Sequence, residues 1–113
     1  MQQELGDRYG QADTLDSLGY THHHLGHHDE ATDCYRKSLD LFRDIGDRYK
    51  QAKTLTHLGD AHLAAGAPGA ARTAWQQALD ILSELSYHVA EPVRAKLRSL
   101  DGDEPAQEDS SLG

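Results

Sequence analysis

The feature that most constrains this chain is an internal repeat. The segment GDRYGQADTLDSLG at residues 6–19 returns as GDRYKQAKTLTHLG at residues 46–59, a shift of 40 positions. The similarity continues downstream, where Tyr35 pairs with Trp75 and Leu39 pairs with Leu79. Self-similarity at a fixed period of roughly 20–50 residues is typical of a stacked repeat array. The sequence therefore predicts two copies of one structural unit, packed against each other.

Each copy has the pattern of two consecutive helices. Large apolar and small residues recur at helical spacing, and glycines at positions 26, 46 and 66 interrupt them where a helix can end in a left-handed residue. We expect helices over residues 8–25, 28–45, 48–65 and 68–85, followed by a shorter one over 89–100. Asp7 and Asp47 are expected to cap the first and third helices. In the first helix the predicted buried stripe is Leu15, Leu18, His22 and Leu25.

Small and aromatic residues at matching positions predict how the helices of each pair approach. Glycine or alanine allows two backbones to come close, and an aromatic side chain fills the gap to the neighbouring helix. The expected structural positions are Gly19, Ala31 and Tyr35 in the first copy and Gly59, Ala71 and Trp75 in the second. A leucine at Gly59 or Ala71 should overpack the pair.

The fold class predicted from these patterns is all-α, an antiparallel helix-pair solenoid with two repeats and a C-terminal capping helix. Residues 6–45 form the first repeat, residues 46–85 the second, and residues 86–100 the capping helix. Residues 1–5 read as the remnant of a preceding helix, so we expect the chain to be a piece of a longer protein. Residues 101–113 contain five acids and no Lys or Arg, which predicts a disordered acidic tail.

Composition narrows the classes of function. The net charge is -8, and no basic stripe is present that could neutralise phosphates, so we expect no direct binding of nucleic acid. No apolar run approaches the roughly 18 residues that a membrane span needs, and the first residues do not resemble a signal peptide, so we expect a cytoplasmic protein. Cys34 is the only cysteine and has no evident catalytic partner. We expect no cofactor and no enzymatic activity.

The order of these residues resembles the tetratricopeptide repeat. The resemblance rests on the spacing of Leu, Gly, small and aromatic residues from Leu15 to Leu39 and again from Leu55 to Leu79. The period of 40 exceeds the family's usual length of about 34 residues. Leucines 15 and 55 stand where the family often has Trp, and histidines 22 and 62 where it often has Tyr. The block LGDRYGQA at residues 5–12 also resembles the long repeats at the C-terminal end of actinobacterial antibiotic-regulatory-protein transcriptional activators, a similarity that spans residues 5–100.

The resemblance implies a non-catalytic module that binds a peptide, or another domain of the parent protein, on the concave face formed by the first helix of each repeat. The residues expected on that face are Asp13, Asp16, Tyr20, His23, His24, Lys53, Thr56, Asp60 and Leu63. Family members that grip a terminal carboxylate use Lys, Arg and Asn at such positions, and this chain does not. The aspartates favour a basic or neutral ligand instead.

Two alternatives remain open from the residues alone. Self-association could cover an apolar face around Leu15 and Leu18 at the N-terminal end, because two repeats are fewer than the three that a stable stack normally needs. The histidine-rich segment HHHLGHH at residues 22–28 could bind a metal ion, with His23 and His27 as weak candidates because of their i, i+4 spacing. Packing by His22 and breakage of the helix at Gly26 speak against a physiological metal site.

Overall fold

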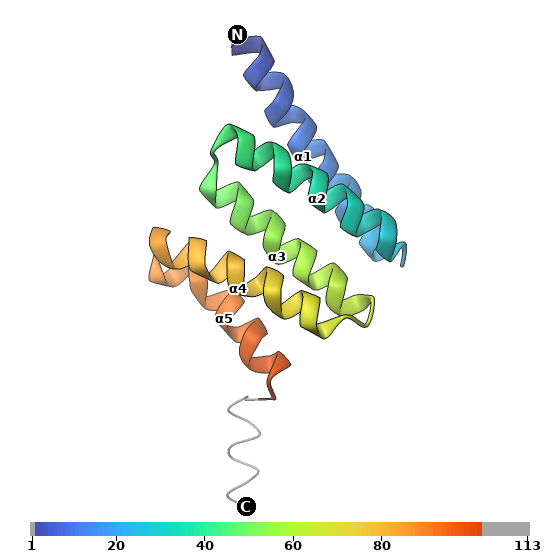
Figure 1. Ribbon diagram of the computed structural model, residues 1–113, viewed down its shortest axis with the longest axis vertical. Coiled ribbons are helices and arrows are strands. Elements are labelled where there is room, and N and C mark those ends of the chain that lie inside the picture. Colours follow the sequence, from blue (N-terminus) through green and yellow to red (C-terminus); the bar gives the residue numbers. More distant parts are fainter. Residues whose placement is uncertain (1, 103–113) are drawn as a thin grey trace, which may run out of the picture.

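The computed structural model describes residues 2–102, and for residues 2–5 it describes the backbone alone. The described chain forms five helices and no strand: α1 (Gln2–His24), α2 (His28–Ile45), α3 (Arg48–Ala64), α4 (Pro68–Leu85) and α5 (Tyr87–Leu100). Figure 1 shows α1 and α2 as one antiparallel pair, α3 and α4 as a second, and α5 against α4. The predicted all-α helix-pair architecture is confirmed. Met1 and residues 103–113, which include most of the predicted acidic tail, lie outside the described residues.

Glycines form the helix ends that separate the elements. Gly26, Gly46 and Gly66 have φ angles of 81, 85 and 80°, in the left-handed region that glycine adopts without a steric penalty. After Gly46 the Asp47 side chain accepts a hydrogen bond from the Lys50 backbone N–H at 2.9 Å and so caps α3, as expected.

The predicted start of the first helix is wrong. The same Gly-Asp pair at Gly6 and Asp7 does not interrupt α1, which runs continuously from Gln2 to His24. Gly6 is not among the glycines with positive φ, so the chain makes no turn there. The division of the chain into an N-terminal remnant, two repeats and a cap stays a prediction.

The core lies mainly in the C-terminal three helices. One buried cluster joins α2, α3, α4 and α5, and consists of Leu39, Ala52, Leu55, Ala71, Trp75, Ala78, Ile81, Leu82, Ala90 and Val93. Because α5 contributes two fully buried side chains and packs Leu97 and Leu100 against the same cluster, it covers the end of the array. A smaller cluster contains Ala31, Tyr35, Leu58, Ala61 and Ala74.

The apolar stripe expected on α1 is largely unburied. Leu18 is 45% exposed and Leu25 is also exposed, while Leu15 and His22 are half-buried. The buried residues of α1 are instead the small ones, Ala12 and Gly19. The physical reason is that α3 packs on both α2 and α4, whereas α1 packs chiefly on α2. Within residues 2–102, the face of α1 that corresponds to the α2-facing side of α3 therefore has no helix packed against it.

Gly19 and Gly59 each pack against the aromatic residue of the same repeat, a pairing that the sequence pattern did not specify. A Cβ atom built on Gly19 would lie 2.7 Å from Cε1 of Tyr35, and one on Gly59 would overlap the Trp75 ring. Tyr35 and Trp75 are nearly fully buried, as are Ala31 and Ala71. No helix of the described residues is long and apolar enough to cross a membrane.

Candidate functional site

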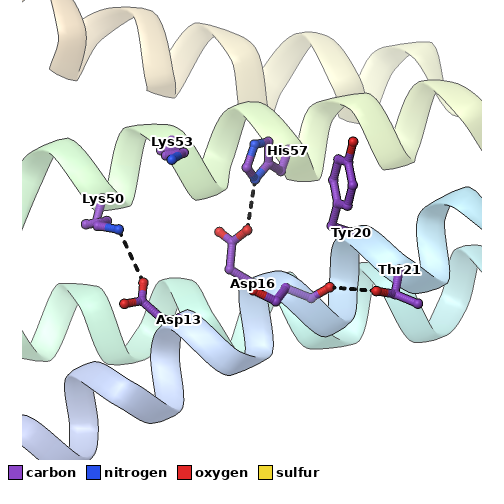
Figure 2. Close-up of a pocket in the computed structure, with 8 residues that line it drawn as sticks. Asp13, Asp16, Tyr20, Thr21, Lys50, Lys53 and His57 are labelled. Atoms are coloured by element: carbon purple, nitrogen blue, oxygen red, sulfur yellow. Dashed lines mark hydrogen bonds and ion pairs between the residues drawn. The ribbon is translucent and has the colours of Figure 1, made fainter.

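A pocket of about 400 Å³ lies between α1 and α3, the first helices of the two repeats. Figure 2 shows Lys50 directed toward Asp13 and His57 directed toward Asp16 across the space between the two helices. From α1 it is lined by Asp13, Asp16, Ser17, Tyr20 and Thr21, and from α3 by Lys50, Lys53 and His57. The residues of each set recur at three- or four-residue spacing, which places them on one face of a helix. The pocket is therefore a polar groove where the two repeats meet, and we refer to it as the α1–α3 groove.

Asp16 is the most connected residue of the groove. Its Oδ1 lies 3.0 Å from Nδ1 of His57, and its Oδ2 accepts a hydrogen bond of 2.8 Å from the fully buried hydroxyl of Thr54. Burial opposes ionisation of Asp16, but the bonds from His57 and Thr54, with the nearby charges of His57 and Lys53, outweigh it and lower the carboxyl pKa. Since an ionised carboxylate only accepts, His57 donates through Nδ1 and keeps Nε2 for other partners.

Lysines 50 and 53 differ in how far they are engaged. Lys50 lies 3.3 Å from the carboxylate of Asp13, and its ammonium also stands 5.9 Å from the ring centroids of Tyr9 and Phe42. Lys53 is exposed, and within residues 2–102 it takes part in no hydrogen bond or ion pair. In Figure 2 it stands between Lys50 and His57 with no dashed line to it. The charge of Lys53 helps to lower the pKa of the Asp16 carboxyl, but its exposed ammonium can still form a direct ion pair with a ligand.

Tyr20 supplies the exposed aromatic surface. Its side chain is 54% exposed, and its ring centroid lies 4.2 Å from that of His24 and 6.4 Å from that of His57. An aromatic ring held between two imidazoles offers a flat contact at a small cost in side-chain entropy. The groove therefore combines one exposed ring, the exposed ammonium of Lys53 and the Asp16–His57 pair.

The structure brings four of the nine residues expected on the concave face into the groove: Asp13, Asp16, Tyr20 and Lys53. His24 lies beside Tyr20 outside the lining, and His23 is half-buried with an Nδ1 atom that has no hydrogen-bond partner. Leu63 is exposed near the end of α3. Thr56 donates to the Ala52 carbonyl oxygen at 2.9 Å, and its own carbonyl oxygen accepts from Trp75.

Asp60 lies on the side of α3 that faces α5. Its carboxylate pairs with Lys96 at 3.0 Å. With Asp13 paired to Lys50 and Asp16 to His57, every aspartate that favoured a basic ligand already has a basic partner. These three aspartates therefore do not favour a basic ligand over a neutral or acidic one.

Sequence reasoning missed Lys50 and His57. Both lie on the Lys53 face of α3, three residues before it and four after it, so helical periodicity could have identified them. What periodicity could not supply is the offset between α1 and α3, which decides that His57 meets Asp16 rather than Asp13.

A second hollow, of about 560 Å³, lies on the opposite side of α3 between α2 and α4. Its floor consists of buried leucines at positions 39, 55 and 58, and its rim carries Arg36 and Arg43. It is larger than the α1–α3 groove, and polar side chains also line it, namely Arg36, Asp40, Arg43, His62, Thr73 and Gln77. The leucines of its floor already belong to the two core clusters, so we do not regard it as the site.

No set of three or more His, Cys, Asp or Glu side chains within the described residues could hold a metal ion. Burial, and secondarily the charge of Asp33, raises the pKa of the Cys34 thiol, which disfavours the nucleophilic thiolate.

The fold defines a helical-repeat protein, with antiparallel helix pairs in tandem and a glycine under the rings of Tyr35 and Trp75. The sequence model of the tetratricopeptide repeat family matches residues 10–84, about two thirds of the chain, and the chain belongs to this family. Comparison with curated proteins and with solved structures gave no match. Repeats of this family generally mediate protein–protein interaction and are not catalytic.

Proposed function

We propose that this chain is a protein-interaction module that binds an extended peptide segment in the α1–α3 groove. The observation that carries the proposal is the convergence of Tyr20, Lys53 and the Asp16–His57 pair in one pocket. The groups that would orient a ligand come from both helices, so a bound segment would contact both repeats at once.

The charges in the groove favour a particular ligand chemistry. Asp13 and Asp16 are satisfied by Lys50, Thr54 and His57, whereas Lys53 is exposed beside them. A carboxylate on the ligand could pair with Lys53, and Nε2 of His57 could bond to a peptide amide or carbonyl. We therefore propose a peptide that carries an acidic side chain next to a residue able to pack on the ring of Tyr20.

Selection from a display library of random peptides, followed by fluorescence-anisotropy titration of the selected peptides, tests this proposal. Lys53→Glu and Tyr20→Ser should each weaken binding about tenfold or more, a loss of about 1.4 kcal/mol. The matched control is Lys37→Glu, which makes the same charge change on the outer surface of α2, where the Lys37 side chain is 63% exposed. Circular dichroism checks that each variant remains folded.

Two results would contradict the proposal. The first is that selected peptides bind the groove variants and the Lys37 variant equally well, because the ligand would then lie elsewhere. The second is that selection enriches no peptide that the unmodified chain binds.

The wider setting of the module is also a proposal. The resemblance of the block at residues 5–12 to repeats of transcriptional activators supports a role in a larger cytoplasmic regulator, in which the ligand could be another domain of the same protein. A cross-link between the Lys53 face of this module and that domain in the full-length protein would test the arrangement, and its absence would count against it.

Self-association is the second candidate, and comparison of the two repeats favours it. Leu58 of α3 is 7% exposed where α3 packs on α2, whereas its counterpart Leu18 in α1 is 45% exposed. The same contrast holds for Gln51 and Thr54, which are buried, against Gln11 and Thr14, which are exposed. The outer face of α1 therefore has the residue types of a face that is covered in the second repeat, and a second copy of the chain could cover it.

Sedimentation velocity over a range of concentrations tests this candidate. The unmodified chain should form a dimer that Leu18→Glu abolishes. Leu63→Glu, at a leucine with similar exposure on α3, should leave the dimer intact. A monomer at every concentration, or a dimer unaffected by Leu18→Glu, would contradict association through α1.

A further inference from the structure

The turn between α1 and α2 brings two histidine side chains together. Gly26 takes the left-handed conformation, its N–H bonds to the carbonyl oxygen of His23 at 3.1 Å, and the N–H of His27 bonds to that of His22 at 2.8 Å. These are the two hydrogen bonds of a Schellman motif, which usually brings the side chains at the positions of His22 and His27 into contact. The backbone of the turn itself therefore sets the two imidazoles against each other.

The second repeat provides an internal comparison. The turn after α3 has the same two bonds, from Gly66 to Leu63 at 3.0 Å and from Ala67 to His62 at 2.8 Å. His62 stands where His22 does, but Ala67 stands where His27 does. The second imidazole is thus an addition to a turn that also forms without it.

The two Nδ1 atoms lie within hydrogen-bond distance of each other, and two ligands of one metal ion can have the same separation. Nδ1 of His22 lies 3.2 Å from Nδ1 of His27, and the ring planes are tilted by 42°. Two imidazole nitrogens bound to one zinc ion at about 2.05 Å and a tetrahedral angle lie about 3.3 Å apart, whereas a right-angled arrangement would place them about 2.9 Å apart. The observed separation is closer to the tetrahedral value.

Access and coordination number define what kind of site this could be. His27 is exposed and His22 half-buried, so an ion can reach both nitrogens from solvent. Within residues 2–102 no third His, Cys, Asp or Glu side chain completes the set. The other two tetrahedral positions would be filled by water, or by the same two histidines of a second copy. The candidate pair is therefore His22 and His27 rather than His23 and His27, because the turn at Gly26 places the His27 ring against that of His22.

We propose that His22 and His27 bind a tetrahedral divalent transition-metal ion, with zinc as the preferred ion, through their Nδ1 atoms.

Isothermal titration of the full chain, without any added histidine tag, with zinc chloride tests the proposal. Cobalt(II) serves as a second probe, since its visible absorption distinguishes tetrahedral from octahedral coordination. The unmodified chain should bind zinc and give a tetrahedral cobalt spectrum. His27→Ala should abolish both signals, and it is compatible with the turn because the second repeat already has alanine there.

The matched control is His24→Ala, which removes an exposed neighbouring imidazole and leaves the pair in place. This variant should retain zinc binding. A stoichiometry of one zinc per chain or one per two chains agrees with the proposal, and sedimentation with zinc separates the two. Undiminished binding by His27→Ala, an octahedral cobalt spectrum, or no binding by the unmodified chain would overturn it.

Discussion

The indole N–H of Trp75 donates a hydrogen bond of 3.1 Å to the backbone carbonyl oxygen of Thr56, and this bond fixes the Trp75 ring over Gly59 one turn further along α3. A side chain at Gly59 would occupy the position of the ring. The contact between the two helices of the second repeat therefore depends on the absence of a Cβ atom at that position.

Gly59→Ala should destabilise the protein in spite of the higher helix propensity of alanine. The propensity gain is at most about 1 kcal/mol. Displacement of the Trp75 ring and loss of its bond to Thr56 should cost more, about 1–3 kcal/mol. Chemical denaturation followed by circular dichroism measures the difference. The control is Gly10→Ala in α1, where a new Cβ would meet nothing within 4 Å, so a gain of up to about 1 kcal/mol is expected. Equal effects of the two changes would contradict the assigned role of Trp75.

The repeat spacing could mark Gly19, Tyr35, Gly59 and Trp75 as structural positions, but the contact between each glycine and its aromatic ring came from the structure. The position of Asp7 inside a continuous helix could not be predicted from the sequence. Asp7 and Asp47 lie in nearly identical local sequences, yet Asp47 caps a helix and Asp7 lies within one. Gly46 has φ 85° and its N–H bonds to carbonyl oxygens of α2, so the chain turns there, whereas Gly6 continues the helix. Residues 6–8 are exposed and continue α1, whereas residues 46 and 47 follow the end of α2, so the nearly identical local sequence does not fix the conformation.

The groove shows the same limit. Helical spacing could place Lys50, Lys53 and His57 on one face of α3, but the pairing of His57 with Asp16 depends on how far α3 is shifted along α1. Exposure of Leu18 likewise depends on which neighbours α1 has, and not on its own apolar pattern.

Ser38→Ala should destabilise the first repeat. The buried Ser38 hydroxyl donates a hydrogen bond of 2.7 Å to the carbonyl oxygen of Ala12, and so links α2 to α1. The second repeat has Ala78 at the matching position, packed in the apolar core. Because Ala12 is a small residue that cannot close the space left by the hydroxyl, the loss should be about 0.5–1.5 kcal/mol. Thermal or urea unfolding measures it, and a stability equal to that of the unmodified chain would show that the bond adds nothing.

Tyr9 and Asp47 should make folding sensitive to high pH. The Tyr9 hydroxyl donates a hydrogen bond of 2.7 Å to the carboxylate that caps α3, and this bond, with smaller contributions from burial and negative charge, raises the pKa of Tyr9 to about 12. An unfolded tyrosine titrates near pH 10. The raised pKa therefore contributes stability that is complete below about pH 10 and is lost as the pH rises toward about 12.

Ultraviolet absorbance of the phenolate during a pH titration measures this pKa in the folded chain. Tyr9→Phe should remove the part of the stability loss between pH 10 and about 12 that comes from Tyr9. The free energy of unfolding of this variant at neutral pH should be lower by about 0.5–1.5 kcal/mol. Asp47→Asn should keep part of the helix cap while lowering the pKa of Tyr9. A Tyr9 pKa that is the same in the Asp47 variant would contradict the assigned cause.

His62 should make folding sensitive to mild acid. Burial, and secondarily the charge of Arg36 on α2, lowers the pKa of His62 below its ordinary value of 6.5. The folded state therefore keeps His62 neutral at a pH where the unfolded chain binds a proton. Because the unfolded state then binds more protons, stability is highest above about pH 6.5 and falls as the pH decreases below it.

His62→Gln should reduce the loss of stability between pH 7.5 and 5.5, as measured by urea unfolding at each pH. Arg36→Gln should reduce it less, since burial is the larger cause and remains in that variant. If Arg36→Gln reduced the loss as much as His62→Gln, the neighbouring charge rather than burial would be the dominant cause of the low pKa.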